Sequence, residues 1–310
     1  MPLIATSRPL PFPANIPSRQ GALEFRHIPA DALVPEGTPA YVSTAVDPVT
    51  AQMIAAFPDS LRLIANFGTG TDNIDLKAAR ARGITVSNTP VVTEDTADMA
   101  FALILAACRK LGENERFLRD GSWDATRPMA SMGLRVHGQT LGLIGFSPIA
   151  QAVARRARGF DMQIRYWNRT RRPEAEAALG AEYVASPDEL VAGSDIVSLH
   201  TALVPETRHL IDAARLARFR QGAVLVNTAR GPLVDEKALA EALRSGHLAA
   251  AGLDVFEAEP TVDPGLLALP NVVLTPHIGS ATAACRTDMG RRVIANLLAF
   301  LENGAALDPV

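Results

Sequence analysis

The chain has 310 residues, of which 48% are apolar and 20% charged, and its formal net charge is −3. This composition excludes a disordered or fibrous chain and allows a globular protein of two domains. A weakly acidic balance gives no electrostatic reason to bind nucleic acid or an anionic membrane, so a small molecule is the expected substrate.

The sequence shows neither a signal peptide nor a membrane span. Residues 1–13 lack a basic start followed by an apolar stretch, and the longest apolar run, residues 99–108, is too short to cross a bilayer. Cys108 and Cys285 stand far apart without metal-ligand spacing, so both are expected to be reduced, buried thiols. These features favour a cytoplasmic protein without a metal site.

The first predicted elements form a small α/β unit. Residues 40–46, 61–68 and 84–88 have the β-branched and apolar composition of strands. A helix is expected over residues 75–83, between the last two strands, and Gly83 is its C-terminal stop.

A single long helix is expected next. Thr93 is a suitable N-cap and Gly121 a suitable stop, which gives a helix of about 28 residues. Such a length exceeds what one small domain buries, so we expect this helix to bridge domains and to join a subunit interface.

A second series of strands alternating with helices begins at residue 140. The expected strands are residues 141–146, 162–167, 196–200, 223–228, 250–256 and 271–277. Helices are expected over residues 148–159, from the N-cap Ser186, over 235–246 and, at the end of the chain, over 284–304. This alternation predicts an α/β protein with a mostly parallel, doubly wound sheet.

A glycine loop stands between the first strand and the first helix of this series, the context that gives a dinucleotide-binding motif weight. Against the pattern GxGxxG/A, Gly145 fills the first position, Ser147 the second and Ala150 the third, while Pro148 suits the first helical turn. A side chain at Ser147 either pushes the phosphates of a dinucleotide outward or donates a hydrogen bond to them. The alternative is an ordinary turn that binds no nucleotide.

The choice of cofactor is expected to depend on Asn168. It ends the next strand, about 20 residues past the glycine loop, where an NAD-selective site has an acid for the ribose 2′-hydroxyl. Here the neutral amide is followed by Arg169, Thr170, Arg171 and Arg172. Guanidinium groups bind a 2′-phosphate bidentately, so NADP is favoured over NAD as the cofactor. A solvated basic turn has the same composition and is the alternative.

Longer strings resemble the D-2-hydroxyacid dehydrogenase family. They are NTARGPLVDEKALAEALRSGHLAAAGLDVFEAEP at 227–260, LPNVVLTPHIGSAT at 269–282, IANFGTGTDNID at 64–75 and GITVSNTP at 83–90. Within the family the chain resembles the bacterial glyoxylate/hydroxypyruvate reductases, partly through MGLRVHGQTLGLIG at 132–145 and YWNRTRR at 166–172. The resemblance covers nearly the whole chain, and its strings occur in the family's order.

The resemblance implies a two-domain architecture. A Rossmann-type cofactor domain, residues 93–282, would be inserted into a smaller flavodoxin-like substrate domain formed by residues 1–92 and 283–310. The active site would lie in the cleft, and a homodimer would be held largely through the cofactor domain.

The resemblance also implies catalytic roles. Arg230 would bind the carboxylate and the carbonyl oxygen of a 2-keto acid with its fork-shaped donors. His277 would donate the proton, because an imidazole cycles near neutral pH, and Glu259 would fix its tautomer and favour its protonated form. Taken singly, each residue has a structural alternative: a surface turn, a solvated acid and a buried histidine.

Other positions carry over string by string. The loop of Asn66, Phe67, Gly68 and Thr69 would hold the substrate carboxylate with backbone N–H groups, unless it is a mere tight turn. Besides the residues already named, the expected cofactor contacts are Thr96, Phe146, Ile149, His200, Thr201, Thr207, Thr228, Ala229, Asp254 and Gly279. Thr201 and Ala202 replace the Cys and Pro common in the family, and Asp254 is alternatively a structural acid at a strand end.

The predicted function is reduction of glyoxylate, hydroxypyruvate or a related small 2-keto acid to the D-2-hydroxy acid. Dehydrogenation of phosphite, formate or phosphoglycerate is a rival within the same fold. A rival of another class is a cofactor-sensing interaction protein, since the family includes transcriptional corepressors that keep the three catalytic-type residues. Turnover on a panel of keto acids discriminates between these functions.

Overall fold

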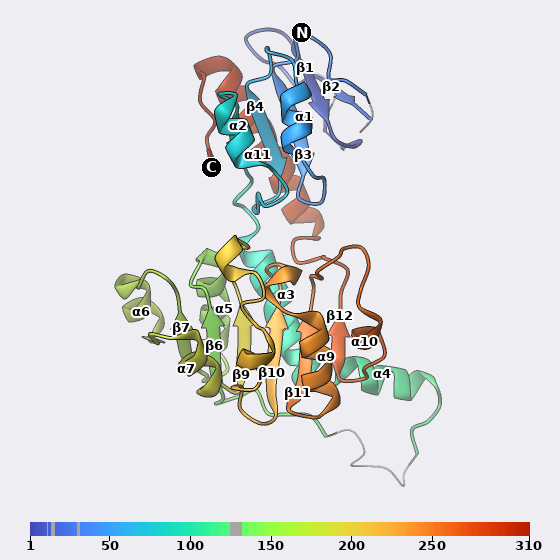
Figure 1. The fold of residues 1–310 in the computed structure, drawn as a ribbon, viewed down its shortest axis with the longest axis vertical. Coiled ribbons are helices and arrows are strands. Elements are labelled where there is room, and N and C mark those ends of the chain that lie inside the picture. The colour runs from blue at the N-terminus through green and yellow to red at the C-terminus, as the bar shows by residue number, and fades with distance from the viewer. Residues whose placement is uncertain (11, 14–15, 30–31, 125–131) are drawn as a thin grey trace. The chain divides into compact units, whose positions relative to one another are not determined.

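The computed structural model describes residues 1–10, 12–13, 16–29, 32–124 and 132–310, which divide into two compact units (Figure 1). Unit 1 comprises Met1–Val92 and Ala281–Val310, and unit 2 comprises Thr93–Ser280. Unit 1 therefore takes its sequence from two separate stretches, whereas unit 2 is continuous.

Unit 1 is built on a five-stranded parallel sheet with the strand order β2-β1-β3-β4-β5. Its strands are β1 (Leu3–Thr6), β2 (Glu24–His27), β3 (Ala40–Thr44), β4 (Leu63–Phe67) and β5 (Thr85–Ser87). The order 2-1-3-4-5 is that of flavodoxin-like folds, as expected for this part of the chain. The sequence does not predict β1 and β2, because each has only four residues and leaves no periodic apolar pattern.

Helices cover both faces of this sheet. α1 (Ala51–Ala56) and α2 (Leu76–Ala81) share a buried cluster with Ile64 of β4. α11 (Ala283–Asn303) also packs on β4, where Gly290 lies near the Phe67 ring. Because side chains alternate along a strand, Ile64 and Phe67 point to opposite faces, so α11 covers the face that α1 and α2 leave.

Unit 2 is built on a seven-stranded parallel sheet with the order β12-β11-β10-β9-β6-β7-β8. Its strands are β6 (Thr140–Ile144), β7 (Gln163–Trp167), β8 (Ala181–Tyr183), β9 (Ile196–Leu199), β10 (Ala223–Asn227), β11 (Leu248–Leu253) and β12 (Val272–Leu274). Counted from β6, this order is 3-2-1-4-5-6-7, the Rossmann arrangement extended by one strand. The predicted doubly wound parallel sheet is confirmed.

Two helical layers enclose the sheet of unit 2. α3 (Thr93–Cys108) and α5 (Pro148–Arg158) bury apolar side chains in one cluster, and α7 (Pro187–Ala192), α8 (Ala213–Leu216) and α9 (Glu236–Arg244) bury theirs in another. The remaining elements are α4 (Leu111–Arg119), α6 (Pro173–Leu179), α10 (Pro264–Leu267) and 3-10 turns at Pro205–Thr207 and Gly231–Leu233. The predicted N-cap Ser186 accepts the Asp188 N–H at 3.1 Å.

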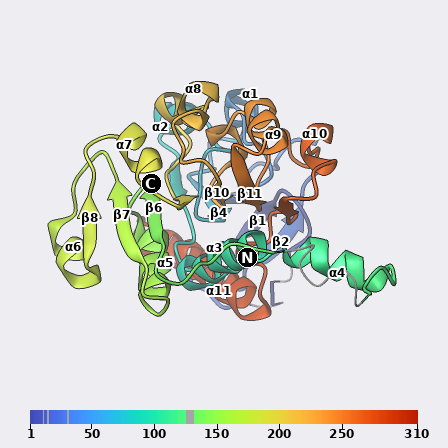
Figure 2. The same ribbon diagram turned by 90° about the horizontal axis from the view of Figure 1, so that it is seen from below.

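The single helix predicted from Thr93 to Gly121 is wrong, because the structure has two helices there. Lys110 has a left-handed φ of 51° between α3 and α4. The carbonyl of Cys108 accepts the N–H of Leu134 at 2.7 Å, so a distant segment takes an acceptor that a continuous helix would use. α4 extends away from the sheet of unit 2 in both Figure 1 and Figure 2.

Candidate active site

The glycine loop lies at the point where the strand order of unit 2 reverses, between β6 and β9. Gly145 follows β6 with a φ of 90°. A Cβ on Gly145 would lie 2.6 Å from the carbonyl oxygen of His200 and 2.8 Å from the nitrogen of Thr201. Glycine alone combines this φ with this close approach. Open α/β sheets bind their ligands at such a switch point.

Ser147 is the N-cap of α5. Its hydroxyl oxygen accepts the Ala150 N–H at 3.4 Å, and Pro148 occupies the first helical position as predicted. A hydroxyl that accepts a hydrogen bond keeps its own proton, so Ser147 can still donate to a phosphate. Ala150 is fully buried, as close packing at the third motif position requires.

The arginines after β7 differ in whether their side chains interact with other described residues. Arg171 pairs with Glu176 at 2.8 Å and lies over the ring of Tyr183 at 5.5 Å. Asn168 donates its amide N–H to the Thr170 carbonyl at 2.7 Å, which closes the turn. By contrast, the exposed side chain of Arg169 takes part in no ion pair among the residues that the structure describes. Arg169 is therefore the better candidate for a phosphate contact.

The loop after β9 holds two predicted cofactor residues whose side chains turn inward. The Nε2 of His200 lies 2.9 Å from the Ser198 hydroxyl, and burial lowers the pKa of this imidazole to about 3. The Thr207 hydroxyl accepts the Val204 N–H and donates to the Ala202 carbonyl, both at 2.8 Å. These side chains stabilise the loop, which leaves its backbone and the half-buried Thr201 for the expected cofactor contacts.

The Thr228 hydroxyl, just past β10, is buried and makes no hydrogen bond with any described residue. A buried hydroxyl without a partner is costly, so a polar ligand group is expected to satisfy it. Thr96 of α3 is also buried, and a Cβ on Gly279 would lie 3.6 Å from its methyl group. The glycine turn, the N-terminus of α5 and the Thr228 hydroxyl at one edge of the sheet fit a dinucleotide.

Arg230 lies in a turn fixed by Asn227, a residue that the sequence analysis does not single out. Asn227 accepts the Ala229 N–H at 3.0 Å and donates to the Arg230 carbonyl at 2.8 Å. Gly231 packs closely against Phe256: a Cβ added to Gly231 would lie 1.9 Å from the Phe256 carbonyl carbon. The local signal for this turn is the asparagine itself, which often bonds the backbone two residues on.

The loop that carries His277 is held by Asp254, just past β11. The Asp254 carboxylate is buried and accepts the N–H groups of Ile278 at 2.8 Å and Gly279 at 2.7 Å and the Thr275 hydroxyl at 2.6 Å. His277 has a positive φ of 53° and donates its backbone N–H to the Asp254 carbonyl at 2.9 Å. Asp254 thus has the structural role that the sequence left open, and its contact with a nicotinamide stays a prediction.

Glu259 and His277 form a half-buried, hydrogen-bonded pair. One carboxylate oxygen of Glu259 lies 2.7 Å from Nδ1 of His277, and the other accepts the Phe256 N–H at 3.0 Å. Burial by itself raises the pKa of Glu259, but the hydrogen bonds from His277 and Phe256 and the charge of Arg230 outweigh it and lower this pKa. An ionised carboxylate only accepts hydrogen bonds, so Nδ1 carries a proton and Nε2 is the nitrogen that exchanges one.

The predicted substrate loop begins inside β4 of unit 1, whose last two residues are Asn66 and Phe67, and only Gly68 and Thr69 follow the strand. The three catalytic candidates belong to unit 2. Asn66 is fully buried, accepts the Ser43 hydroxyl at 3.0 Å and donates to the Gly70 carbonyl at 2.7 Å. A Cβ on Gly68 would lie 2.7 Å from Cβ of Ala45. Asn66 therefore shapes the loop from inside, and the tight backbone is the part suited to bind an anion.

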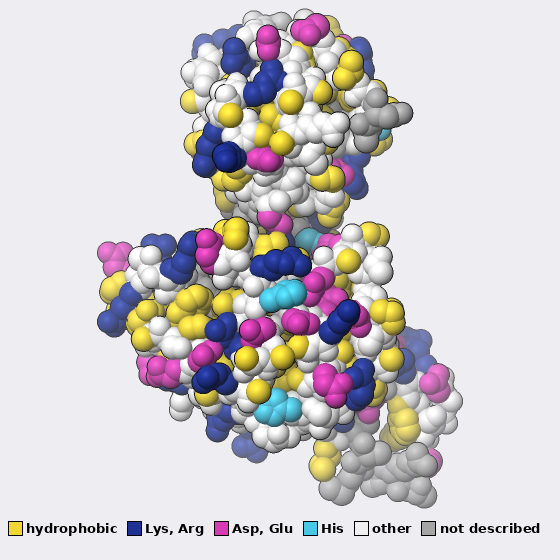
Figure 3. Space-filling view, in the orientation of Figure 1, with side chains coloured by type: hydrophobic (Ala, Val, Ile, Leu, Met, Phe, Trp, Pro, Cys, Tyr) yellow, Lys and Arg dark blue, Asp and Glu magenta, His cyan; other side chains and the backbone are white. Residues whose placement is uncertain are grey.

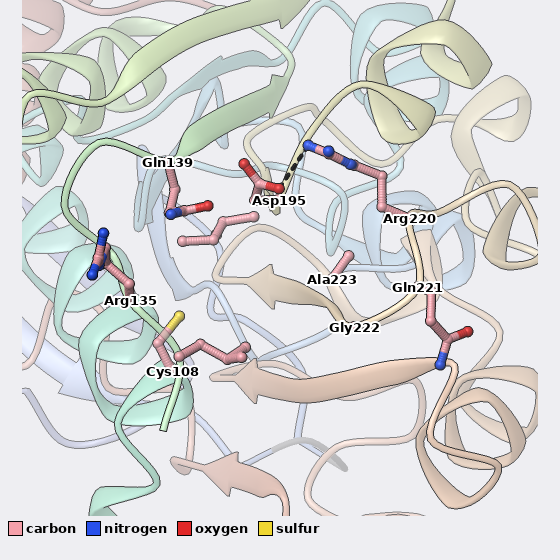
Figure 4. Close-up of a pocket in the computed structure, with 10 residues that line it drawn as sticks. Cys108, Arg135, Gln139, Asp195, Arg220, Gln221, Gly222 and Ala223 are labelled. Carbon is pink, nitrogen blue, oxygen red and sulfur yellow. Dashed lines mark hydrogen bonds and ion pairs between the residues drawn. The ribbon is translucent and has the colours of Figure 1, made fainter. Parts of the chain in front are cut away.

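A separate pocket of about 240 Å³ lies at the opposite edge of the unit 2 sheet, beside the first residues of β9 and β10 (Figure 4). Asp195 and Arg220 form an ion pair at 2.7 Å in its wall. Since functional groups of a parallel sheet meet at the carboxyl ends of the strands, this pocket is not part of the candidate site.

Among the residues that the structure describes, no group of three His, Cys, Asp or Glu side chains could hold a metal ion. No helix in this part of the chain is long and apolar enough to cross a membrane. Cys108 and Cys285 are both buried thiols outside any disulfide, as expected.

The family model and the related sequences all point to the D-2-hydroxyacid dehydrogenases. Residues 101–279 match the family model "D-isomer specific 2-hydroxyacid dehydrogenase, NAD binding domain". The chain is 50% identical over 264 residues to a glyoxylate reductase of Korarchaeum cryptofilum, which covers 84% of this chain and 79% of that protein. It is 46% identical over 288 residues to a glyoxylate reductase of Thermococcus kodakarensis, covering 91% of this chain and 86% of the other.

Solved structures agree with the sequence comparison. The NADPH-dependent glyoxylate/hydroxypyruvate reductase of Sinorhizobium meliloti, in complex with NADP and malonate, is 36% identical with a TM-score of 0.87, over 100% of this chain and 96% of that one. The D-mandelate dehydrogenase of Rhodotorula graminis is 32% identical with a TM-score of 0.85, over 100% and 97%. The chain belongs to the family of D-isomer specific 2-hydroxyacid dehydrogenases.

Proposed function

We propose that this protein reduces a small 2-keto acid, glyoxylate or hydroxypyruvate, to the D-2-hydroxy acid with NADPH, NADH being the alternative cofactor. The observation that carries this proposal is the 2.7 Å pair of Glu259 and His277 beside Arg230 in the cofactor-type unit. The named activities of the relatives support the same substrate class.

The chemistry divides among three side chains. A bound nicotinamide supplies the hydride. Arg230 binds the substrate carboxylate and polarises the carbonyl oxygen. His277 gives the proton on Nε2 to that oxygen, while the Glu259 carboxylate stabilises the imidazolium before transfer and holds Nδ1–H throughout. We also propose that the Asn66–Thr69 loop binds the substrate carboxylate through backbone N–H groups.

The preference for NADP rests on the segment after β7. Asn168 places no negative charge beside a 2′-phosphate, and Arg169 is exposed and outside the ion pairs found among the described residues. A guanidinium in this place binds a phosphate through a charge-assisted fork of hydrogen bonds. The NADP complex of the Sinorhizobium meliloti relative supports this choice.

We propose a cytoplasmic homodimer that binds neither nucleic acid nor membrane. α4 buries none of its own residues in the chain, and Leu111, Leu118 and Trp123 are exposed on it and just after it. A second copy of the chain is the partner that suits this apolar surface. Charges of both signs are interspersed over the face of unit 2 in Figure 3, unlike the single-sign patch of a nucleic-acid binder.

A kinetic screen tests the proposal. NADPH and NADH oxidation would be followed with glyoxylate, hydroxypyruvate, pyruvate, phenylpyruvate and longer keto acids. We expect the highest kcat/KM for glyoxylate or hydroxypyruvate with NADPH. Lack of turnover on the whole panel would contradict the proposal and leave the cofactor-sensing interaction protein.

A further inference from the structure

The loop that carries Glu259 is anchored to the first turn of α9. This loop runs over residues 257–263, and Glu236, the first residue of α9, lies beneath it with 8% of its surface exposed. A carboxylate oxygen of Glu236 accepts the Glu257 N–H at 2.7 Å, and the carboxylate also lies within electrostatic reach of Asp263. One side chain thus holds the start of the loop and lies near its end.

The contact between Glu236 and Glu257 is reciprocal. A Glu257 carboxylate oxygen accepts the Glu236 N–H at 3.2 Å, one of the helix N–H groups that lacks an intrahelical partner. The same Glu257 oxygen lies 3.0 Å from Nε2 of His209. The second carboxylate oxygen of Glu257 lies 3.8 Å from the Arg208 guanidinium. The charge of Arg208 and the hydrogen bond to His209 offset the repulsion between the carboxylates of Glu236 and Glu257.

The buried position of Glu236 disfavours its ionised carboxylate, and the helix does not need this side chain there. Burial raises the pKa of Glu236, and the charges of Glu257 and Asp263 raise it further, against the lowering by backbone N–H groups of the loop. The N-cap of α9 is already supplied by Asp235, which accepts the Ala238 N–H at 3.0 Å. Glu236 therefore serves the loop rather than the helix.

The loop transmits this anchoring to the active-site pair. Glu257 follows Phe256, whose N–H binds Glu259, and Gly231 fixes Phe256 from the side of Arg230. A shift of the backbone at Glu257 therefore displaces the Glu259 carboxylate, which must stay within hydrogen-bond reach of His277.

We propose that Glu236 is a positioning residue that acts through Glu259: it clamps the 257–263 loop so that the Glu259 carboxylate holds the His277 ring in its Nδ1–H form. The catalytic consequence rests on the proposed reductase function. The structural consequence, the tautomer of His277, does not.

The first test is Glu236→Gln, which keeps the size but removes the negative charge and turns one of the two acceptor oxygens into an N–H donor beside the loop. We expect kcat to fall about 10- to 100-fold, the loss typical of a small misplacement of a catalytic group, with the KM for NADPH within twofold. Glu241→Gln is the matched control, because Glu241 is exposed on the same helix, pairs with Arg244 and loses the same charge. Its kcat is expected to equal that of the wild type.

The second test measures the His277 ring without substrate. Ring ¹⁵N shifts, assigned with His277→Asn, report the balance of the two neutral tautomers. We expect Glu236→Gln to shift the balance from Nδ1–H toward Nε2–H, in the direction of Glu259→Gln, and Glu241→Gln to leave it unchanged. An unchanged balance in Glu236→Gln would overturn the proposal even if kcat fell.

A double-variant cycle separates positioning from general stability. In the Glu259→Gln background, Glu236→Gln should lower kcat less than twofold further, because the partner through which it acts is already lost. Full additivity of the two losses would overturn the proposal. A wild-type chain inactive on every keto acid would contradict the reductase function, while the tautomer measurement would still decide the role of Glu236.

Discussion

The backbones of Gly145 and His200 are in direct contact, so closely that a Cβ on Gly145 would lie 2.6 Å from the His200 carbonyl oxygen. This contact joins the ends of β6 and β9 at the reversal of strand order. Because Gly145 has no side chain, a dinucleotide can approach the N-terminus of α5 closely at this turn.

Gly145→Ala is expected to destabilise unit 2 by about 2–4 kcal/mol, the sum of strain at positive φ and overpacking, and to weaken cofactor binding. Gly138→Ala is the matched control, because Gly138 also has a positive φ of 71° but nothing within 4 Å of its Cβ position. Thermal unfolding and NADPH fluorescence titration measure the two effects. If the two variants were equally destabilised, the close contact between Gly145 and His200 would not be the cause.

His277→Ala is expected to lower kcat by about 10²- to 10⁴-fold, since the proton donor is lost. The Kd of NADPH should change little, because His277 is held in its loop by backbone bonds to Asp254. Stopped-flow kinetics and equilibrium titration separate the two quantities. A rate near that of the wild type would remove His277 from the mechanism.

Ser147→Ala is expected to cost about 0.5–2 kcal/mol by loss of the α5 cap, while Ser147→Gly costs only a few tenths. Ser186→Ala removes a comparable cap from α7 and serves as the control for stability. If the Ser147 hydroxyl also donates to a phosphate, both Ser147 variants raise the Kd of NADPH and Ser186→Ala does not. Identical cofactor affinities in all three would limit Ser147 to capping.

Arg169→Ala is expected to raise the KM for NADPH about 10- to 100-fold, the equivalent of a charged hydrogen bond, and to leave the KM for NADH nearly unchanged. Arg171→Ala is the control, because Arg171 is paired with Glu176 and lies over Tyr183. Steady-state kinetics with NADPH and with NADH show which of the two arginines contacts the 2′-phosphate. A larger loss for Arg171→Ala would reverse the assignment.

The buried His200 predicts a loss of stability in acid. Burial lowers its pKa from 6.5 to about 3, so its contribution to stability is complete above pH 6.5 and is lost as the pH falls toward 3. Unfolding of the wild type and of His200→Asn would be compared at pH 7 and pH 4.5. The wild type should lose more stability over this interval than the variant, and parallel losses would exclude His200 as a cause.

Local signals in the sequence predict the elements that depend on neighbouring residues. Gly145, Pro148 and the cap Ser186 each act within one turn of the chain, and the structure has them in the predicted positions. The interruption at Lys110 is beyond such reasoning, because the competing donor, the Leu134 N–H, comes from a later segment of the chain.

The same limit applies to the candidate site. The strings around Arg230, Glu259 and His277 indicate the chemistry, but nothing local shows that Glu236 reaches the loop of Glu259. Likewise, the three arginines of RTRR look equivalent in the sequence until the pairing of Arg171 with Glu176 distinguishes one of them. Tertiary contacts between distant residues decide these cases.

The division of unit 1 between two stretches of chain sets an order of folding during synthesis. Unit 2 is continuous from Thr93 to Ser280 and can complete its sheet as soon as it has left the ribosome. β4 must wait until then for α11, the helix that covers its second face. The strands of unit 1 are therefore made before unit 2 but fully enclosed after it, and one face of β4 stays uncovered on the nascent chain until α11 is made.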